Sequence, residues 1–258
     1  MARGKSRSDT IDNVVKTAGT LAERGVKEII LTGVNLGDFG KGPAGNENNE
    51  TFTGLVKALE KVDGIARYRI SSIEPNLLTS EIIEMVANSD RFMPHFHIPL
   101  QSGSNKILAL MRRRYKKELY ADRVRAIKTL MPHCAIGVDV IVGFPGETAD
   151  DFNETHAFLQ DLDISYLHVF TYSERDHTKA LEIKPVVPAN VRVERNKILR
   201  NLSYMKMQYF TAQHVGQSRK VLFEKGAGSM MEGYTDNYIR VTAARQPGFI
   251  NNIVEWTI

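Results

Sequence analysis

Residues 137–148 read Gly-Val-Asp-Val-Ile-Val-Gly-Phe-Pro-Gly-Glu-Thr, and this stretch constrains the fold more than any other. An apolar run that contains one acid, Asp139, ends in two glycines and a proline, and a helical pattern starts at Thr148. This order predicts a strand that enters a tight turn and then a helix. Gly143 would let a flat ligand approach the backbone, and Asp139 and Glu147 could anchor that ligand or simply brace the turn.

Strand-like and helix-like segments alternate along the chain as far as residue 172. Strands are expected at 28–32, 69–73, 96–100, 136–143 and 166–172, with helical patterns between them. Alternation of this kind predicts a parallel α/β domain whose functional residues lie at the carboxyl ends of the strands. The series begins with a helical pattern and not with a strand, so one strand of the βα series is expected to be missing.

The composition changes at the proline-containing segment 184–188. A long basic amphipathic pattern follows, and after it come short strand-like runs separated by turn residues. We therefore expect a first domain over 1–185, a linking helix over 186–214 and a small all-β domain over 215–258.

Composition also narrows the class of protein. The sequence contains no apolar run long enough to cross a bilayer, so neither a membrane span nor a membrane partner is expected. Its one cysteine, Cys134, has apolar neighbours and reads as a core residue; it rules out an intrachain disulfide and a cysteine-ligated cluster built from this chain alone. A cytoplasmic location fits these features. The net charge of +4 permits a nucleic-acid partner without requiring one.

Polar and glycine residues recur where the expected strands end. Hydroxyl, amide and carboxylate groups suit a ribose, an amino group and an adenine edge better than a phosphate, and no Walker or dinucleotide-binding motif is present. We predict that these residues line one cofactor site, although any one of them could instead satisfy a turn. They are Gly33, Asn35, Ser71, Ser72, Glu74, Gln101, Ser102, Asp139 and Gly143.

The histidines leave a second interpretation open. His95 and His97 are two residues apart on an expected strand and therefore share one of its faces. Together with Asp139 and His168 they could bind a metal, as in barrel hydrolases. Packed or hydrogen-bonded histidines are the more common explanation for such a pattern.

Two basic regions are candidates for nucleic-acid contact. The run from Arg112 to Lys117 contains Arg112, Arg113 and Arg114, with Tyr115 available for stacking on a base. A solvated loop between helices is the alternative. The tail has nearly balanced charge and does not by itself indicate an RNA-binding module. If it is one, its best contacts would be Lys220, Asn237, Tyr238 and Arg240.

Several of these stretches together resemble the methylthiotransferases of the radical S-adenosylmethionine superfamily. The residues 32–40, Thr-Gly-Val-Asn-Leu-Gly-Asp-Phe-Gly, are most similar to the MtaB type, which modifies threonylcarbamoyladenosine beside the anticodon of tRNA. The sister types act on isopentenyladenosine or on a ribosomal protein. The tail resembles a TRAM domain, a small β-barrel that contacts tRNA. The stretches that carry the resemblance are 2–7, 31–40, 69–75, 97–104, 111–113, 139–148 and 168–175.

The resemblance implies an incomplete radical-SAM (TIM-like) βα barrel followed by a TRAM-like domain. It also implies S-adenosylmethionine and two [4Fe-4S] clusters as cofactors of the full-length enzyme, and tRNA as partner. In this family a Cys-x-x-x-Cys-x-x-Cys loop lies just upstream of the stretch that matches residues 2–7. We therefore expect a fragment that lacks this loop, binds no cluster and is inactive alone, and whose exposed sheet edge could favour dimerisation.

Residue by residue, the resemblance implies three groups of contacts to S-adenosylmethionine. Gly33 and Asn35 would contact the methionine moiety. The carboxylate of that moiety, or the ribose, would be contacted by Ser72, Glu74, Gln101 and Ser102. Val142, Gly143 and Phe144 would form the turn beside the adenine. The expected reaction is C2-methylthiolation of a hypermodified adenosine next to the anticodon. A metal-dependent barrel hydrolase and a non-catalytic RNA-binding module are the alternatives.

Overall fold

The computed structural model describes residues 8–41 and 49–258. The resembling stretch 2–7 lies outside this part of the chain. The chain forms two compact units. The first contains the residues up to Ile73, Leu77–Phe96 and His214–Ile258, and the second contains Glu74–Asn76 and His97–Gln213. These units cut across the expected segments, so the boundaries at 185 and 214 stay predictions.

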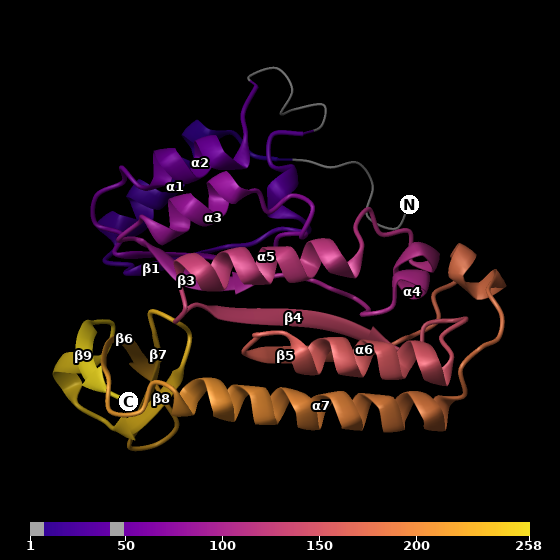
Figure 1. The fold of residues 1–258 in the computed structure, drawn as a ribbon. Coiled ribbons are helices and arrows are strands. Elements are labelled where there is room, and N and C mark those ends of the chain that lie inside the picture. The colour runs from indigo at the N-terminus through magenta and orange to yellow at the C-terminus, as the bar shows by residue number, and fades with distance from the viewer. Residues whose placement is uncertain (1–7, 42–48) are drawn as a thin grey trace. The chain divides into compact units, whose positions relative to one another are not determined.

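The first unit contains three parallel strands in the order β1-β2-β3. Its helices α1, α2 and α3 lie on one face of these strands (Figure 1). Each helix begins after a threonine whose hydroxyl accepts a backbone N–H bond, the usual N-cap interaction. For α1 the cap is Thr10, although Ser8 and Asp9 directly before it are residue types equally suited to this role. The elements are α1 (Ile11–Glu23), β1 (Glu28–Leu31), η1 (Leu36–Asp38), α2 (Phe52–Leu59), β2 (Arg67–Ile70), α3 (Ser80–Ala87) and β3 (Phe92–His97).

The second unit is built on two parallel strands, β4 and β5. The segment that continues β3 runs beside β4, with the Ile98 N–H donating to the Gly137 carbonyl at 2.9 Å. Helix α7 packs along β5. The elements are α4 (Asn105–Leu110), α5 (Lys117–Leu130), β4 (Ala135–Val142), α6 (Ala149–Asp161), β5 (Tyr166–Thr171), η2 (Lys179–Glu182) and α7 (Ala189–Ala212).

Strand β4 separates an apolar layer from a polar one. Val138, Val140 and Val142 are almost completely buried. Because successive side chains of a strand point to opposite faces, Gly137 and Asp139 lie on the other face. Asp139 is directly opposite His168 of β5 in the parallel register. Asp139 therefore lies beside His168 of the neighbouring strand, on the face of the sheet opposite the buried valines.

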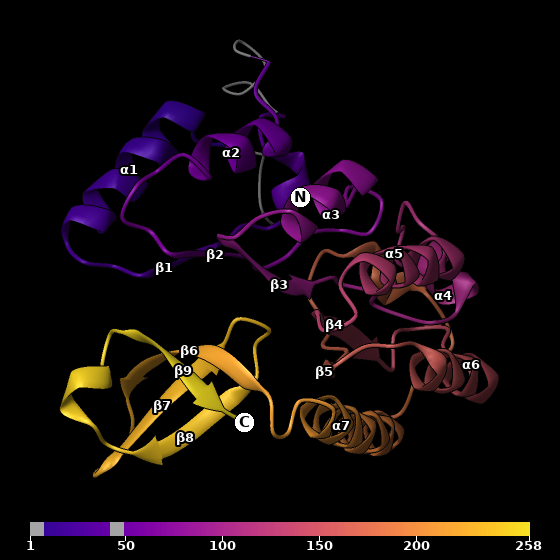
Figure 2. The same ribbon diagram turned by 60° about the vertical axis from the view of Figure 1, so that its left-hand side comes forward.

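The C-terminal part of the first unit is a four-stranded antiparallel sheet with the order β8-β7-β6-β9 (Figure 2). Its core contains Val221, Phe223 and Met231. Trp256 packs edge-on against Phe223, with ring centroids 5.2 Å apart. The elements are β6 (Ser218–Lys225), β7 (Met230–Thr235), β8 (Arg240–Ala244), η3 (Pro247–Phe249) and β9 (Ile253–Thr257).

The structure confirms a parallel α/β sheet followed by a small all-β region. Strand β7 carries little sequence signal, because Gly233 interrupts the apolar alternation of its short sequence. Among the described helices, none combines the length and apolar character that a bilayer crossing requires.

Candidate functional site at the strand ends

The turn after β4 is held by the side chain of Glu147. Gly143 has a φ of +75°, in the left-handed region that favours glycine. Its N–H donates to Glu147 Oε1 at 2.9 Å. Glu147 is buried, and Arg195 of α7 forms an ion pair with the same oxygen. Burial raises the pKa of Glu147, although the Gly143 N–H and Arg195 act in the opposite direction. Of the two roles foreseen for Glu147, its contacts match the one in which it braces the turn.

A second arginine of α7 joins the ends of β4 and β5. Arg192 donates to the carbonyl oxygens of Val187 and Tyr172, at 2.7 and 3.1 Å, and to Glu174 at 2.7 Å. Its side chain also passes close to Gly143, where an added Cβ would lie 2.3 Å from Arg192 Cγ. Both backbone conformation and packing therefore require glycine at position 143.

Helix α6 is anchored at its first turn by Asp151. Thr148 and Asp151 form a capping box, in which each side chain bonds to the backbone N–H of the other residue. Asp151 Oδ2 also pairs with Lys106 at 2.7 Å, and its Oδ1 accepts from Ser104 at 3.0 Å. Burial alone would raise the pKa of Asp151, but the bonds from Lys106, Thr148 and Ser104 outweigh it and lower the pKa to about 2.

The replacement Asp151→Asn is expected to reduce stability near neutral pH by on the order of 2 kcal/mol. A carboxylate with a depressed folded pKa contributes stability above its unfolded value of 3.8, and this contribution disappears as the pH falls towards about 2. The difference between wild type and variant should therefore shrink between pH 4 and pH 2. Urea denaturation at several pH values measures it.

The exposed neighbour Asp150 supplies the control for this prediction. Asp150→Asn should change the unfolding free energy by less than about 0.5 kcal/mol at any pH. A difference between wild type and Asp151→Asn that stays constant from pH 7 to pH 2 would refute the assigned role.

The remaining candidates of the second unit have different surroundings. Gln101 follows β3 with a φ of +72° and forms a bridge to Val140. Phe144 lies edge-on to Tyr172, with centroids 5.3 Å apart. Glu74 pairs with Arg113 at 3.0 Å. Ser102 is buried and contacts the Thr155 hydroxyl, which indicates a structural role.

Gln101, Gly143 and Phe144 thus stay the best candidates for cofactor contact in the second unit. The side chain of Val142 is buried in the apolar layer.

Four candidates belong to the first unit, and one of them, Ser71, donates its backbone N–H to the Leu31 carbonyl at 3.1 Å. Gly33 follows β1 and is exposed, and Asn35 donates to Asp38 at 3.0 Å. The Leu36 N–H donates to the Ser72 carbonyl at 3.2 Å, so the segments that follow β1 and β2 are joined. These contacts bring Gly33, Asn35 and Ser72 to the same end of the β1–β2 pair.

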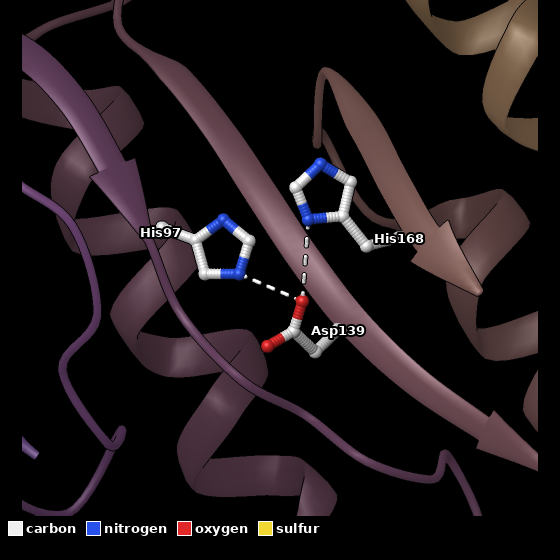
Figure 3. Close-up of side chains that lie close together, drawn as sticks. All are labelled: His97, Asp139 and His168. Atoms are coloured by element: carbon white, nitrogen blue, oxygen red, sulfur yellow. Dashed lines mark hydrogen bonds and ion pairs between the residues drawn. The ribbon is translucent and has the colours of Figure 1, made fainter. Parts of the chain in front are cut away.

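Asp139, which was expected to contact the cofactor, contacts two histidine side chains. His97 Nε2 lies 2.8 Å and His168 Nδ1 3.4 Å from Asp139 Oδ1, so both rings direct a nitrogen at one carboxylate oxygen (Figure 3). Burial alone would raise the pKa of Asp139. The hydrogen bonds from His168 and His97 outweigh it and hold the pKa well below its usual range. We call His97, Asp139 and His168 the His-Asp-His cluster.

His95, the fourth member of the expected metal set, lies in the other compact unit. Its ring stacks on that of Tyr238 with centroids 4.0 Å apart. The structure therefore brings together three of the four residues proposed as metal ligands.

The basic run between α4 and α5 is only partly available to a ligand. Arg112 and Arg114 are exposed, and Arg112 has a φ of +56°. Tyr115, expected to stack on a base, is instead buried and donates its hydroxyl to the carbonyl oxygens of Pro99 and Leu100. Burial leaves the Tyr115 ring unavailable for stacking, because its hydroxyl finds acceptors in the segment that follows β3.

Of the four candidates in the tail, one is buried and another is half-buried in ring stacking. Asn237 is fully buried and accepts from the Thr235 hydroxyl at 2.6 Å. Tyr238 stacks on both His95 and Tyr234. Lys220 is exposed, whereas the exposed Arg240 pairs with Glu232 at 2.5 Å. Lys220 and Arg240 therefore stay candidates for nucleic-acid contact.

The junction that holds Tyr238 was not foreseen. Arg67 and Arg69 of β2 are almost completely buried and donate to backbone carbonyls of the antiparallel sheet. Arg69 contacts Thr235 and Asp236 at 2.7 and 2.9 Å and pairs with Glu28 at 2.9 Å. The only sequence signal was the alternation of two arginines with apolar residues in a strand.

The comparisons with known proteins agree with this architecture. A sequence model of the Radical SAM superfamily matches residues 1–159, and the chain belongs to this superfamily. It is 39% identical over 98% of its length to the threonylcarbamoyladenosine tRNA methylthiotransferase MtaB of Bacillus subtilis strain 168, covering 57% of that protein. It is 34% identical over 99% of its length to the tRNA-2-methylthio-N(6)-dimethylallyladenosine synthase of Pelotomaculum thermopropionicum, also covering 57%.

One solved structure shows the same fold at low sequence identity. Coproporphyrinogen III oxidase HemN from Escherichia coli, a radical SAM enzyme, aligns with a TM-score of 0.52 and 14% identity, over 79% of this chain and 46% of its own. The chain spans little more than half the length of the relatives named above.

Proposed function

We propose that this chain is the larger part of a tRNA methylthiotransferase of the MtaB type. The complete enzyme would introduce a methylthio group at C2 of threonylcarbamoyladenosine beside the anticodon. The observation that supports this most is the identity of 39%, over nearly the whole chain, to a relative of that name. The parallel βα architecture and the glycine turn after β4 agree with it.

S-adenosylmethionine fits the chemistry of the residues at the strand ends. In the second unit Gln101 offers an amide, and Gly143 and Phe144 form a turn in which only glycine fits beside Arg192. In the first unit Asn35 and Ser72 supply an amide and a hydroxyl. Such groups suit the ribose and the amino-acid end of the cofactor. When bound to a complete radical SAM enzyme, this cofactor supplies radical chemistry; the residues of the second unit would orient it and exclude water.

An iron–sulfur cluster does not fit the residues of this chain. A [4Fe-4S] cluster requires several thiolates, and the sequence contains one cysteine. Cys134 is buried and its sulfur contacts the Ala135 carbonyl at 3.5 Å. We propose that the ligands of both expected clusters lie outside these 258 residues, and that the chain alone is inactive.

The antiparallel sheet is proposed to be a TRAM-like domain that contacts tRNA. Lys220 and Arg240 are exposed on it, and Arg112 and Arg114 are exposed in the second unit. Arginine and lysine side chains bind phosphates in a salt-dependent manner. The proposed location is the cytoplasm, where tRNA is modified. We also propose that two copies of the chain could dimerise through an open edge of the parallel sheet, where unpaired backbone groups can bond to another strand.

Expression of the complete coding sequence that contains this chain tests the proposal. In a bacterial host without its own MtaB-type enzyme, mass spectrometry of digested tRNA should detect methylthiolated threonylcarbamoyladenosine. Gly143→Ala should reduce the product at least tenfold, because an added Cβ meets Arg192.

Gly19→Ala is the matched control, since nothing lies within 4 Å of an added Cβ on α1. Its product level should equal that of the wild type. Unmodified threonylcarbamoyladenosine in every strain, with methylthio groups on another nucleoside, would overturn the assignment of substrate. An absence of methylthio groups altogether would overturn the proposed activity.

A further inference from the structure

The His-Asp-His cluster combines three potential metal ligands from three consecutive strands of the parallel series. His97 ends β3, Asp139 lies in the middle of β4 and His168 lies in β5. Regular strands hold their side chains more precisely than loops do. The parallel register fixes Asp139 opposite His168, and the Leu100 N–H, three residues after His97, donates to the Asp139 carbonyl at 3.2 Å. The three side chains therefore converge because of the sheet itself.

The spacing of the donor atoms is close to that of a metal site. Their ligating atoms all lie within 4.8 Å of one another. A tetrahedral metal with bonds of about 2.0–2.1 Å places its ligands about 3.3 Å apart. The distance of 3.4 Å between His168 Nδ1 and Asp139 Oδ1 already matches, and the 2.8 Å between His97 Nε2 and the same oxygen requires a small opening.

The surroundings of the cluster support a site with one accessible side. The side chains of His97 and Asp139 are 12% and 22% exposed, whereas that of His168 is 54% exposed. Tyr166 flanks both imidazoles, with ring centroids 6.4 Å from His97 and 5.3 Å from His168. Gly137 makes room for this ring, because a Cβ there would lie 2.3 Å from Tyr166 Cζ. Two ligands are thus shielded, and the third leaves a route for an ion.

We propose that His97, Asp139 and His168 bind one divalent transition-metal ion of the zinc type, with Nε2, a carboxylate oxygen and Nδ1 as ligands. Two imidazoles and one carboxylate suit zinc and its first-row neighbours better than magnesium or calcium, which prefer oxygen ligands. Three protein ligands leave a fourth position for water or a substrate group. The inference rests on the geometry of this cluster and is independent of the proposed tRNA activity.

Titration of the 258-residue protein with zinc and with cobalt tests the site. Isothermal titration after treatment with a chelator should give one zinc ion per chain. Cobalt should produce the visible absorption of a four- or five-coordinate complex. His168→Ala and Asp139→Asn should each weaken zinc binding at least tenfold. His168 is more than half exposed, so its replacement should leave the fold intact, which circular dichroism checks.

His156→Ala on α6 is the control for a histidine outside the cluster, and its zinc affinity should equal that of the wild type. Zinc binding that survives both His168→Ala and Asp139→Asn would overturn the proposal, as would the absence of stoichiometric binding in the folded wild-type protein. In the latter case the cluster would be a hydrogen-bonded group only.

Discussion

Replacement of Arg195 by methionine should destabilise the chain by about 3–5 kcal/mol at pH 8, because it leaves the carboxylate of Glu147 buried without its cation. Glu147 would retain the Gly143 N–H bond, but this bond alone does not offset the loss of solvation. The turn after β4 should loosen first. Chemical denaturation monitored by circular dichroism measures the loss.

The pH dependence of the unfolding free energy of Arg195→Met shows whether the buried carboxylate of Glu147 causes the loss of stability. Without Arg195, burial raises the pKa of Glu147 further above its unfolded value of 4.5. A carboxyl group with a raised folded pKa favours the folded state when it is protonated, so stability is retained at low pH and lost as the pH rises through that pKa. The penalty of Arg195→Met should therefore be smaller at pH 5 than at pH 8, and adding Glu147→Gln should recover part of it.

Arg200 of the same helix is exposed and serves as the matched control. Arg200→Met should cost less than about 0.5 kcal/mol. Equal losses for the two arginine variants, or a penalty for Arg195→Met that does not change with pH, would show that the buried ion pair is not the source of the effect.

The second large effect is expected from Arg69→Met. This change removes the nearer of the two cations paired with Glu28, leaving Arg67 at 3.7 Å, and it removes the two donors that satisfy the carbonyls of Thr235 and Asp236 inside the first unit. It also removes the guanidinium that lies 5.2 Å from the centre of the Tyr238 ring. A loss of about 3–5 kcal/mol is expected for breaking a buried charge network of this kind.

Hydrogen exchange followed by mass spectrometry should localise this effect. Faster exchange is expected in β1, β2 and the turn between β7 and β8, while α6 in the other unit should exchange as in the wild type. Arg245→Met, at an exposed position after β8, is the control. Uniformly faster exchange over both units would mean that Arg69 supports the whole chain and not this junction.

Most of the secondary structure was predictable because the apolar periodicity changes clearly between strands and helices. The turn after β4 carries its own signal in Gly143, Gly146 and the Thr148 capping box. Strand β7 was missed because two methionines, a glutamate and Gly233 give no clear period of two. The Thr10 cap of α1 was missed because Ser8 and Asp9, two equally good capping residues, lie directly before it.

The sequence predicted which types of residue form the candidate site, but it did not predict most of the contacts between their side chains. A sequence shows that Asp139 is an acid in a strand, but only the register reveals that His97 and His168 share one of its oxygens. Likewise, the sequence shows Arg192 and Arg195 only as members of a long basic amphipathic pattern. Their burial depends on the packing of α7 along β5, and no local pattern predicts a contact between residues so far apart.

Trp256 has a practical consequence for all of these measurements. It is the only tryptophan in the sequence, and it lies among Phe223 and Phe249 in the core of the antiparallel sheet. Tryptophan emission therefore acts as an intrinsic optical probe of this sheet alone, whereas far-ultraviolet ellipticity is dominated by the helices of both units. Recording both signals in one denaturation experiment would reveal whether the sheet melts together with the rest of the chain or separately.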